Sequence, residues 1–363
     1  MSKKLTVHMD KKPIYDIIIT EGYNQLSQVF TTLEVTGRKI CIVTDSNVGP
    51  LYAEEVAGIA GDYASFVTTF TFPAGEESKN LDTVSDLYKH LIENQFDRND
   101  ILFALGGGVV GDLTGYAAAT YLRGIRFVQL PTSLLAMVDS SIGGKTGVDY
   151  KAYKNMIGAF KQPEAVYMNL QVLDTLPERI YLSGFGEIIK HGMIQSAPYY
   201  GEISDQAQQL CNRDLTALEE IIYKSCEIKR AVVEEDPTEK GIRALLNFGH
   251  TLGHAIEKCL DFSLYHGECV TLGYVCAAYI SCQRGYITRE ELAGIEQITK
   301  ALQLPIRQSN LPVEDILAAT RNDKKMDGNT VKFILLHAIG DAYIDKTVTM
   351  DEMKDALHYL EAK

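Results

Sequence analysis

Long apolar runs and an excess of basic residues are both missing from this chain of 363 residues. Nowhere do 18 apolar residues follow one another, so no segment is predicted to span a bilayer. The first residues, MSKKLTVHMDKK, lack the apolar core of a signal peptide. Asp and Glu outnumber Lys and Arg by 48 to 35, for a net charge of -13. We therefore expect neither nucleic acid nor membrane as a partner, although a local cluster of cations can still bind a small anion.

Paired cysteines are also absent. The seven cysteines form no C-x-x-C motif, and no repeat or low-complexity tract interrupts the chain. Such a set is typical of reduced, mostly buried thiols rather than of a disulfide framework. The cysteines therefore favour a cytoplasmic protein.

What is present in the first half is an alternation of short apolar runs with amphipathic stretches. Residues 39–44, 64–70 and 101–105 are continuous, β-prone runs, which suit parallel strands buried on both faces. Residues 80–93 carry apolar side chains at helical spacing. The alternation predicts an open, doubly wound α/β domain, similar to a Rossmann fold, over residues 1–178.

The second half changes character. From residue 179 the apolar period is close to 3.6 and strand-like runs nearly vanish, except for a short β-prone run at 331–336. We therefore expect a second, all-α domain over residues 179–363.

A glycine-rich run, GGGVVGD at 106–112, follows the predicted strand 101–105 and leads into a helical pattern. Glycines there let the backbone approach a pyrophosphate, and a helix N-terminus supplies free N–H donors. The G-x-G-x-x-G match is weak by itself, since a tight strand-to-helix turn needs the same residues. The acidic ribose ligand expected about 20 residues later is replaced by Arg123 and Arg126, whereas Asp45 ends an earlier strand. These features predict a variant of the dinucleotide site.

Lysines gather after the segment DSSIGGKT at 139–146. This segment is not a nucleotide-triphosphate loop, because Asp139 stands where that motif needs its first glycine. A lysine flanked by glycine still suits a phosphate, and Lys145, Lys151, Lys154 and Lys161 concentrate positive charge in an acidic chain. The alternative is a solvated lysine face.

Histidines cluster in the second half. His250 and His254, four residues apart, lie on one face of a predicted helix, and His266 follows in HGE. The pattern is not that of a zincin, because Thr251 replaces the glutamate of H-E-x-x-H. Three of the eight histidines so close together predict a metal site, with Glu187 of GFGEIIKHG as a fourth candidate. Spacing alone leaves open which three groups bind the metal and which one transfers a proton.

Taken together, these blocks resemble one family. GGGVVGDLTGYAAATYLRG, QLPTSLLAMVDSSIGGKTGV, KNMIGAF, GEIIKHG, RALLNFGHTLGHAIE and HGE are similar, in this order, to the signature blocks of 3-dehydroquinate synthases. The similarity runs from about residue 45 to about residue 325, and six ordered blocks are far more specific than any single motif.

The resemblance implies a residue set for each ligand. The metal, zinc or cobalt, would be held by Glu187, His250 and His266, which leaves His254 as a proton relay. NAD would contact Asp45, Glu76, Lys79, Gly107, Gly108, Val109, Val110, Gly111, Asp112, Thr132, Ser133, Lys145, Lys154 and Thr175. The substrate phosphate would be held by Lys145, Asn155, Lys325 and Arg123 of a neighbouring subunit in a homodimer, and its carboxylate and hydroxyls by Lys190, Lys229, Arg243 and Asn247. Asp139 completes the expected catalytic set.

The implied reaction converts 3-deoxy-D-arabino-heptulosonate 7-phosphate to 3-dehydroquinate and phosphate. It would proceed by transient oxidation with NAD, phosphate elimination, re-reduction and intramolecular aldol closure, within the shikimate pathway that leads to chorismate and the aromatic amino acids. The cation cluster suits a substrate that carries both a phosphate and a carboxylate.

Three alternatives differ from this interpretation by identifiable features. A metal-dependent polyol dehydrogenase of the glycerol type pairs a glycine-rich turn with a helical metal domain, but it has no use for Lys145, Lys229, Arg243 and Lys325. Another sugar-phosphate cyclase, such as one that makes a valiolone precursor, has a substrate without the carboxylate that Lys229 and Arg243 would bind. A nucleotide-binding module without catalysis leaves the histidines unexplained.

Overall fold

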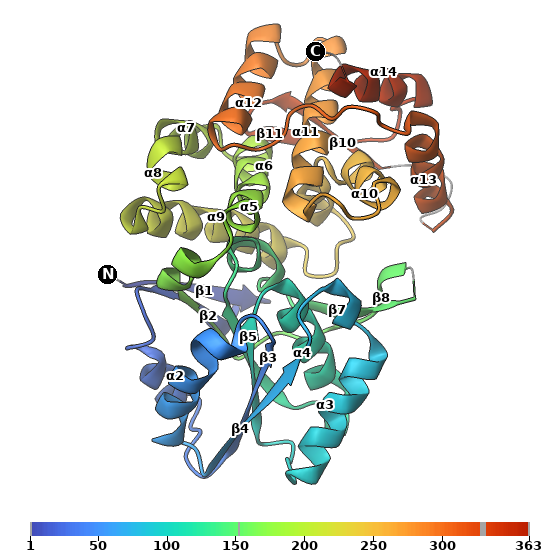
Figure 1. The fold of residues 1–363 in the computed structure, drawn as a ribbon. Helices are drawn as coiled ribbons and strands as arrows, with labels where there is room; N and C mark the ends of the chain where they lie inside the picture. Colours follow the sequence, from blue (N-terminus) through green and yellow to red (C-terminus); the bar gives the residue numbers. More distant parts are fainter. Residues whose placement is uncertain (1, 152, 327–331, 362–363) are drawn as a thin grey trace. The chain divides into compact units, whose positions relative to one another are not determined.

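The computed structural model describes residues 2–151, 153–326 and 332–361, and it describes no side chains from 321 to 326. The chain forms two compact units, Met1–Leu176 and Pro177–Lys363. Figure 1 shows a sheet in the first unit and a helical array in the second.

The first unit is built on a seven-stranded sheet in the order β1-β2-β9-β6-β5-β3-β4. Neighbouring strands are parallel from β2 to β4, and β1 pairs antiparallel with β2. The strands are β1 (Ser2–Met9), β2 (Lys12–Thr20), β3 (Lys39–Asp45), β4 (Phe66–Phe72), β5 (Ile101–Gly106), β6 (Arg126–Pro131) and β9 (Ala165–Asn169). The helices are α1 (Leu26–Thr32), α2 (Gly49–Gly61), α3 (Leu81–Glu93) and α4 (Gly108–Thr120), with short turns η1 (Glu76–Ser78), η2 (Tyr121–Arg123), η3 (Ala136–Ser140) and η4 (Leu170–Thr175).

The direction of the crossovers reverses inside this sheet. The chain leaves β3 through α2 toward β4, and it leaves β5 through α4 in the opposite direction toward β6. In open α/β sheets ligands bind outside the carboxyl ends of the strands at such a switch point. Asp45 ends β3 and Gly106 ends β5, so both border this point.

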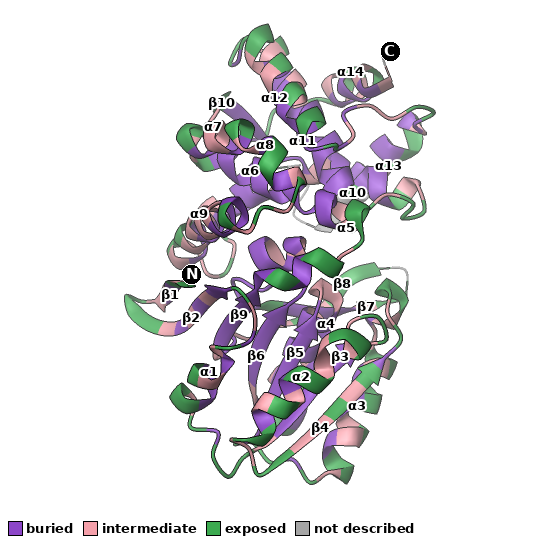
Figure 2. Cartoon of the chain, turned by 60° about the vertical axis from the view of Figure 1, so that its left-hand side comes forward, coloured by how far each residue is buried: buried purple, intermediate pink, exposed green. Residues whose placement is uncertain are grey.

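The doubly wound fold expected from the alternation is confirmed, and one detail of it is wrong. β5 is buried along its whole length, and β3 is buried at every position between its ends. β4, by contrast, is buried only at its last residue, because it forms the edge of the sheet and has a neighbour on one side alone. Figure 2 shows the central strands in the buried colour and much of α2 and α3 in the exposed one.

A small hairpin extends the first unit. β7 (Lys145–Tyr150) pairs antiparallel with β8 (Tyr153–Phe160). β7 packs against α4, as its glycine contacts show: a Cβ added at Gly115 would lie 2.4 Å from Thr146 Cγ2. The outer strand β8 exposes Tyr153, Met156 and Phe160.

The second unit is mostly helical, as expected. Its helices are α5 (Glu178–Ser183), α6 (Phe185–Gln195), α7 (Ala197–Asp205), α8 (Ala207–Cys211), α9 (Leu215–Glu235), α10 (His250–Cys259), α11 (His266–Gln283), α12 (Arg289–Ala301), α13 (Val313–Met326) and α14 (Met350–Glu361), with the turn η5 (Ile242–Asn247). α11 is buried over most of its length and contacts α6, α10, α12 and α14, which is the pattern of a central helix.

The expectation of an all-α unit needs one correction. β10 (Phe333–Ala338) and β11 (Asp341–Asp345) form an antiparallel hairpin. β10 contains most of the β-prone run predicted at 331–336, although residue 331 lies outside the described residues. The hairpin is held against helices rather than in a larger sheet: it packs on α11, α6 and η5, and Gly340 donates to Met193 of α6.

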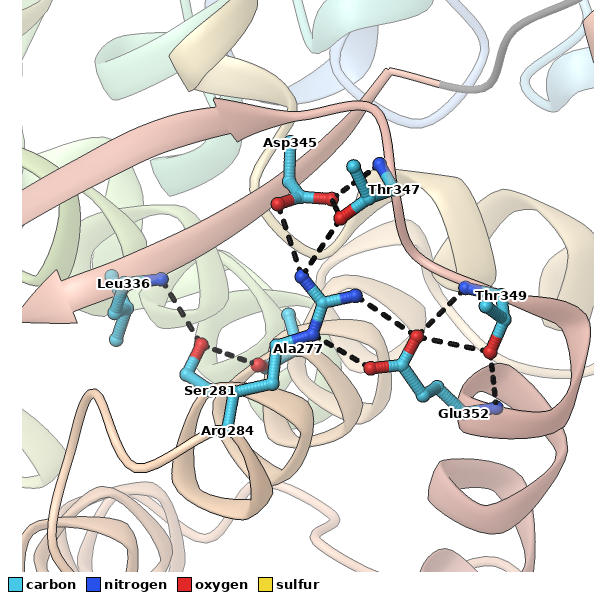
Figure 3. A network of polar contacts seen from close by, with 8 residues as sticks. All are labelled: Ala277, Ser281, Arg284, Leu336, Asp345, Thr347, Thr349 and Glu352. Carbon is cyan, nitrogen blue, oxygen red and sulfur yellow. Dashed lines mark hydrogen bonds and ion pairs between the residues drawn. The ribbon is translucent and has the colours of Figure 1, made fainter.

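One arginine connects the end of α11 with β11 and α14 (Figure 3). Arg284, directly after α11, donates from Nε and Nη2 to Glu352 of α14 at 2.6 and 2.9 Å, and from Nη1 to Asp345 of β11 at 3.0 Å. Glu352 also accepts from the backbone of Thr349, so it caps α14 as well. Such bidentate, charge-assisted pairs are among the stronger polar contacts in proteins.

Candidate functional site

The glycine-rich run forms the turn between β5 and α4. Gly107 is the N-cap residue of α4 and carries no side chain that could accept from the first N–H groups of the helix. A Cβ added at Gly106 would lie 2.4 Å from Val110 Cγ2, and one at Gly111 would lie 2.6 Å from Gln129 Oε1, so close packing demands these glycines. The turn thus presents backbone donors and the positive end of a helix at the switch point of the sheet.

Several predicted nucleotide-binding residues lie near this turn. Thr132 follows β6 and donates its backbone N–H to Gly106, and Ser133 Oγ would be 3.5 Å from a Cβ on Gly107. Asp45 closes β3, where its Oδ1 accepts from the N–H groups of Asn47 and Val48. The structure therefore brings the ends of β3, β5 and β6 together around the turn. Thr175 contacts the hydroxyl of Tyr52 on α2, another element that follows β3.

A buried lysine connects three segments beside the turn. Lys79 Nζ donates to Asp112 Oδ2 on α4 and to Asn155 Oδ1 on β8, each at 2.7 Å. Burial lowers the pKa of Lys79, but Asp112 and Glu76 together outweigh burial and raise it, so the ammonium stays charged. Asn155 has a positive φ of 53° and donates its N–H to Asp149, whose own N–H donates to Lys79. Lys154 Nζ lies 3.9 Å from Glu76 Oε1.

The residues predicted for the phosphate are spread along the hairpin. Lys145 is exposed and pairs with Phe160 at the end away from the turn, whereas Asn155 lies close to the Tyr150–Tyr153 pair at the other end. The pairing therefore separates Lys145 from Asn155 along the hairpin. Asp139 lies in η3, and its neighbour Ser140 would be 3.2 Å from a Cβ on Gly108, so this segment passes the start of α4.

Arg123 sits on an exposed turn with unusual backbone geometry. Leu122, Arg123 and Gly124 all have positive φ, at 50°, 66° and 131°. A non-glycine residue pays a conformational cost in this region, and two in succession make an uncommon turn. Both side chains are exposed in the unit, so the turn presents an arginine beside an apolar neighbour.

In the second unit, glycines bring the histidine helices together. Gly249 precedes α10 with φ of 82°, and an added Cβ there would lie 2.7 Å from Tyr274 N on α11. A Cβ on Gly273 would lie 1.8 Å from Gly249 O, and one on Gly253 2.8 Å from Cys269 O. Because α10 and α11 approach so closely, side chains from both helices can converge on one point.

His250, His254 and His266 do converge. The distances between their ring centroids are 4.9, 5.4 and 5.5 Å, and one ligand atom from each lies within 4.8 Å of the others. His254 is exposed in the unit, and the other two are partly buried. Burial and the nearby Lys190 hold the pKa of His250 well below its usual value, so this imidazole is neutral near pH 7.

Glu187 joins the histidines from α6. A Cβ added at Gly186 would lie 2.5 Å from Gly267 O, so α6 also packs directly on the start of α11. Glu187 is fully buried, and its Oε1 lies 3.6 Å from Nε2 of both His250 and His266, while Lys190 contacts Oε2. Burial alone would raise the pKa of Glu187, but Lys190 and the two imidazoles hold it well below its usual range.

His266 lies between two carboxylates. Its Nε2 faces Glu187 at 3.6 Å and its Nδ1 faces Glu257 Oε2 at 3.4 Å. Burial lowers the pKa of His266, but the nearby carboxylates of Glu187 and Glu257 outweigh it and raise the pKa to about 9. The start of α11 is held separately, because Arg179 of α5 makes two 2.7 Å bonds with Glu268.

The cationic residues predicted for a carboxylate are also buried here. Lys229 of α9 and Arg243 of η5 are 5% and 2% exposed, and η5 packs against both α9 and α6. Arg243 Nη1 donates to Pro237 O, and Asn247 Nδ2 donates to Glu239 Oε1 at 2.9 Å. Lys325 lies outside the residues whose side chains are described.

Sequence reasoning missed two acidic residues beside this cluster. Glu257 contacts His266, and Glu239 contacts Asn247. Glu257 follows His250 by seven positions and His254 by three, so it shares their helix face, and this spacing could have revealed it. Glu239 lies in an irregular segment with φ of 58°, where spacing carries no such signal.

Comparison with known proteins places the chain in a family. The model of the 3-dehydroquinate synthase N-terminal region matches residues 69–183, and that of the C-terminal region matches 184–326. A 3-dehydroquinate synthase of Acetivibrio thermocellus is 44% identical over 332 residues, 92% of each chain. One from Streptococcus suis is 42% identical over 98% of this chain and 99% of its own.

A solved structure extends the similarity to the fold. The 2-epi-5-epi-valiolone synthase of Streptomyces hygroscopicus, with NAD+ and Zn2+ bound, superposes with a TM-score of 0.88 at 25% identity, over 98% of this chain and 99% of its own. The much higher identity to the dehydroquinate synthases favours them over the valiolone-type cyclases and the polyol dehydrogenases. The resemblance predicted from six sequence blocks is confirmed: this chain belongs to the 3-dehydroquinate synthase family.

Proposed function

We propose that this chain is a phosphorus–oxygen lyase that converts 3-deoxy-D-arabino-heptulosonate 7-phosphate to 3-dehydroquinate and inorganic phosphate. The observation that carries the proposal is the convergence of Glu187 with three histidines beside a buried lysine. The curated relatives named as this synthase, at 41–45% identity, supply the substrate class.

The donor set fits a divalent metal. Two ligands bonded to a tetrahedral zinc at about 2.0–2.1 Å lie about 3.4 Å from each other. Glu187 Oε1 lies 3.6 Å from Nε2 of His250 and of His266, which is too long for a hydrogen bond and close to this spacing. One carboxylate with imidazoles suits zinc or cobalt, and we assign Glu187, His250 and His266 as the ligands.

The turn after β5 fits a dinucleotide. Its uncapped helix start and its glycines allow a pyrophosphate close approach, and the switch point of the sheet lies at the same edge. We assign NAD to this turn together with Asp45, Glu76, Lys79, Asp112, Thr132, Ser133, Lys145, Lys154 and Thr175. The solved relative with NAD+ and Zn2+ supports both cofactors.

When bound, the metal would polarise a substrate hydroxyl and the nicotinamide would take up and return a hydride. The protein's own residues position the substrate for this chemistry. Lys190, Lys229 and Arg243 are buried cations that can bind the substrate carboxylate in a site of low dielectric constant, with Asn247 on a hydroxyl. We assign the phosphate to Lys145, Asn155, Lys325 and Arg123 of a second subunit, with Asp139 nearby in sequence.

His254 is the proposed proton relay. It is the most exposed of the three histidines, so it can exchange protons with solvent or substrate while His250 and His266 face Glu187. The geometry supports this division, because neither of those two could serve as a base while its Nε2 is bound to a metal.

A homodimer and a cytoplasmic location complete the proposal. Arg123 stands on an exposed turn with a strained backbone, and such strain is common at functional sites. All seven cysteines are free thiols, four of them buried, as in proteins of reducing compartments. In the part of the chain that the structure describes, no helix is long and apolar enough to cross a bilayer.

The test is an assay of purified protein with the heptulosonate phosphate, NAD+ and Zn2+, in which inorganic phosphate and NADH absorbance are followed together. We expect phosphate release matched by dehydroquinate formation, without lasting NADH. A chelator should stop the reaction and added zinc should restore it. Steady NADH accumulation with glycerol, and no phosphate release, would establish a polyol dehydrogenase instead. Light scattering of the same preparation tests the dimer.

A further inference from the structure

The imidazole rings of His250 and His266 have the same orientation relative to Glu187. In each ring Nε2 lies 3.6 Å from Glu187 Oε1, and in each ring Nδ1 faces an oxygen on the opposite side. For His250 that oxygen is the backbone carbonyl of Phe248, at 3.2 Å. For His266 it is a side-chain oxygen, Glu257 Oε2, at 3.4 Å.

This arrangement suits a ring that binds a metal through Nε2. A neutral imidazole has one N–H donor and one lone pair, and a carbonyl or carboxylate oxygen can only accept. Glu187 beside Nε2 is an acceptor too, but with a metal on the Nε2 lone pair the remaining ring proton would lie on Nδ1, next to the acceptor on that side. A metal ligand needs that lone pair, and acceptors beyond metal-binding histidines recur for this reason.

Glu257 is well placed for the task. It is 6% exposed, and burial of a carboxylate is costly unless it is paired. It lies one turn beyond His254 on the same face of α10, so this face carries two imidazoles and the carboxylate that meets the third. His266 begins α11, so the bond from Glu257 also crosses between the two helices.

We propose that Glu257 is a positioning residue that holds His266 as its Nδ1-protonated tautomer, with Nε2 directed at the metal. The inference rests on the proposed function, because it takes His266 as a ligand. It assigns no contact with substrate to Glu257. The carbonyl that orients His250 cannot be removed by substitution, whereas Glu257 can, so of the two histidine ligands His266 is the one whose orientation is open to direct test.

The experiment measures zinc affinity by chelator competition, without NAD+ or substrate. Glu257→Leu should weaken binding by about 10- to 100-fold, the range known for lost partners of metal-binding histidines. Glu257→Gln keeps an acceptor oxygen and should recover most of the affinity. The matched control is Glu219→Gln, because Glu219 is also 6% exposed and lies in the same unit, on α9, and its substitution should leave affinity within twofold.

The His266 ring is examined separately, by its nitrogen chemical shifts and its N–H exchange in zinc-loaded protein. We expect zinc on Nε2 and a proton on Nδ1 in the parent chain and in Glu257→Gln, and an Nδ1–H that exchanges faster with solvent in Glu257→Leu. Unchanged zinc affinity in a folded Glu257→Leu, or a parent ring that binds zinc through Nδ1, would overturn the proposal. A parent chain that binds no zinc would sink the proposed function, whereas a parent that binds zinc as tightly as Glu257→Leu would overturn the part played by Glu257 alone.

Discussion

Each unit buries a lysine against a carboxylate, and the two pairs are built differently. Around Lys79 the acceptors are in excess: Asp112 and Asn155 each lie at 2.7 Å, and Glu76 at 3.9 Å. Around Glu187 the positive or protonatable groups are in excess, because one carboxylate faces Lys190 and two imidazoles. In the first pair, the ammonium group of Lys79 has hydrogen-bond acceptors from two other segments, so it joins three segments of the chain. The second leaves a buried anion among groups that a metal can use as ligands.

The largest expected effect comes from removing that anion. Glu187→Gln takes away one metal ligand and the partner of buried Lys190, so zinc should be lost and phosphate release should fall by at least about a thousandfold, or about 4 kcal/mol. Bound zinc and initial rates measure both. Glu219→Gln is the control for a buried carboxylate elsewhere. A variant that kept a tenth of the parent rate would place the metal outside this cluster.

Removing the cation of the other pair should lower the stability of the fold, in addition to weakening the NAD site to which Lys79 is assigned. Lys79→Met leaves Asp112 without its closest cation in a mostly buried position, and breaking such pairs costs about 3–4 kcal/mol. Urea unfolding measures the loss. The double variant Lys79→Met/Asp112→Leu should recover most of it, because it removes both charges. If the double variant is no more stable than the single one, the pair is not the source of the effect.

Lys229 tests the difference between the two lysine–carboxylate pairs further. It is a buried cation whose proposed role is to bind substrate rather than to stabilise the fold. Lys229→Ala should lower kcat/KM by roughly 2–4 kcal/mol of transition-state binding for the carboxylate substrate. Zinc affinity in the absence of substrate should stay within twofold. An unchanged kcat/KM would remove Lys229 from the site.

The smallest effect concerns a pair near the surface. Hydrogen bonds from Arg284 lower the pKa of Glu352 from 4.5 to about 2. The folded protein therefore binds this proton more weakly than the unfolded chain, so the stabilisation is complete above pH 4.5 and is lost as the pH falls toward 2. After screening by solvent it should amount to about 1–2 kcal/mol. In urea unfolding, the stabilities of Glu352→Gln and the parent should differ at pH 6, and the difference should shrink as the pH falls from 4.5 toward 2. A difference that does not change with pH would contradict the assignment.

The sequence predicts local features well and contacts between distant segments poorly. The strand 101–105, the turn after it and the helical pair His250 and His254 all follow from patterns within a few residues. The exposure of β4 does not, because a strand's place at the edge depends on the order in which distant segments pair. The same holds for Asn155, whose contact with Lys79 joins positions 76 residues apart.

Charge placement shows this limit most clearly. A count of lysines and histidines predicts cations for an anionic substrate. It cannot tell which of these side chains instead form contacts within the protein. Lys79 and Lys190 look alike in the sequence, each close to a glutamate three positions earlier. The folded chain gives one of them two acceptors from other elements and sets the other beside a single carboxylate and the histidines. Long-range packing decides this, and spacing carries no record of it.

The contacts of Arg284 with Glu352 have a consequence for the synthesis of the chain on the ribosome. Arg284 and Glu352 are 68 positions apart, so the end of α11 meets its partner only after almost the whole chain has been made. At about 5–20 residues per second, this leaves an interval of roughly 3–14 s on the ribosome. The first unit, complete at Leu176, can fold well before then. During this interval, the C-terminal end of the helix that begins with His266 lacks its contacts with Glu352. Nascent chains halted before residue 352 should therefore be the form that proteases cut most readily within this unit.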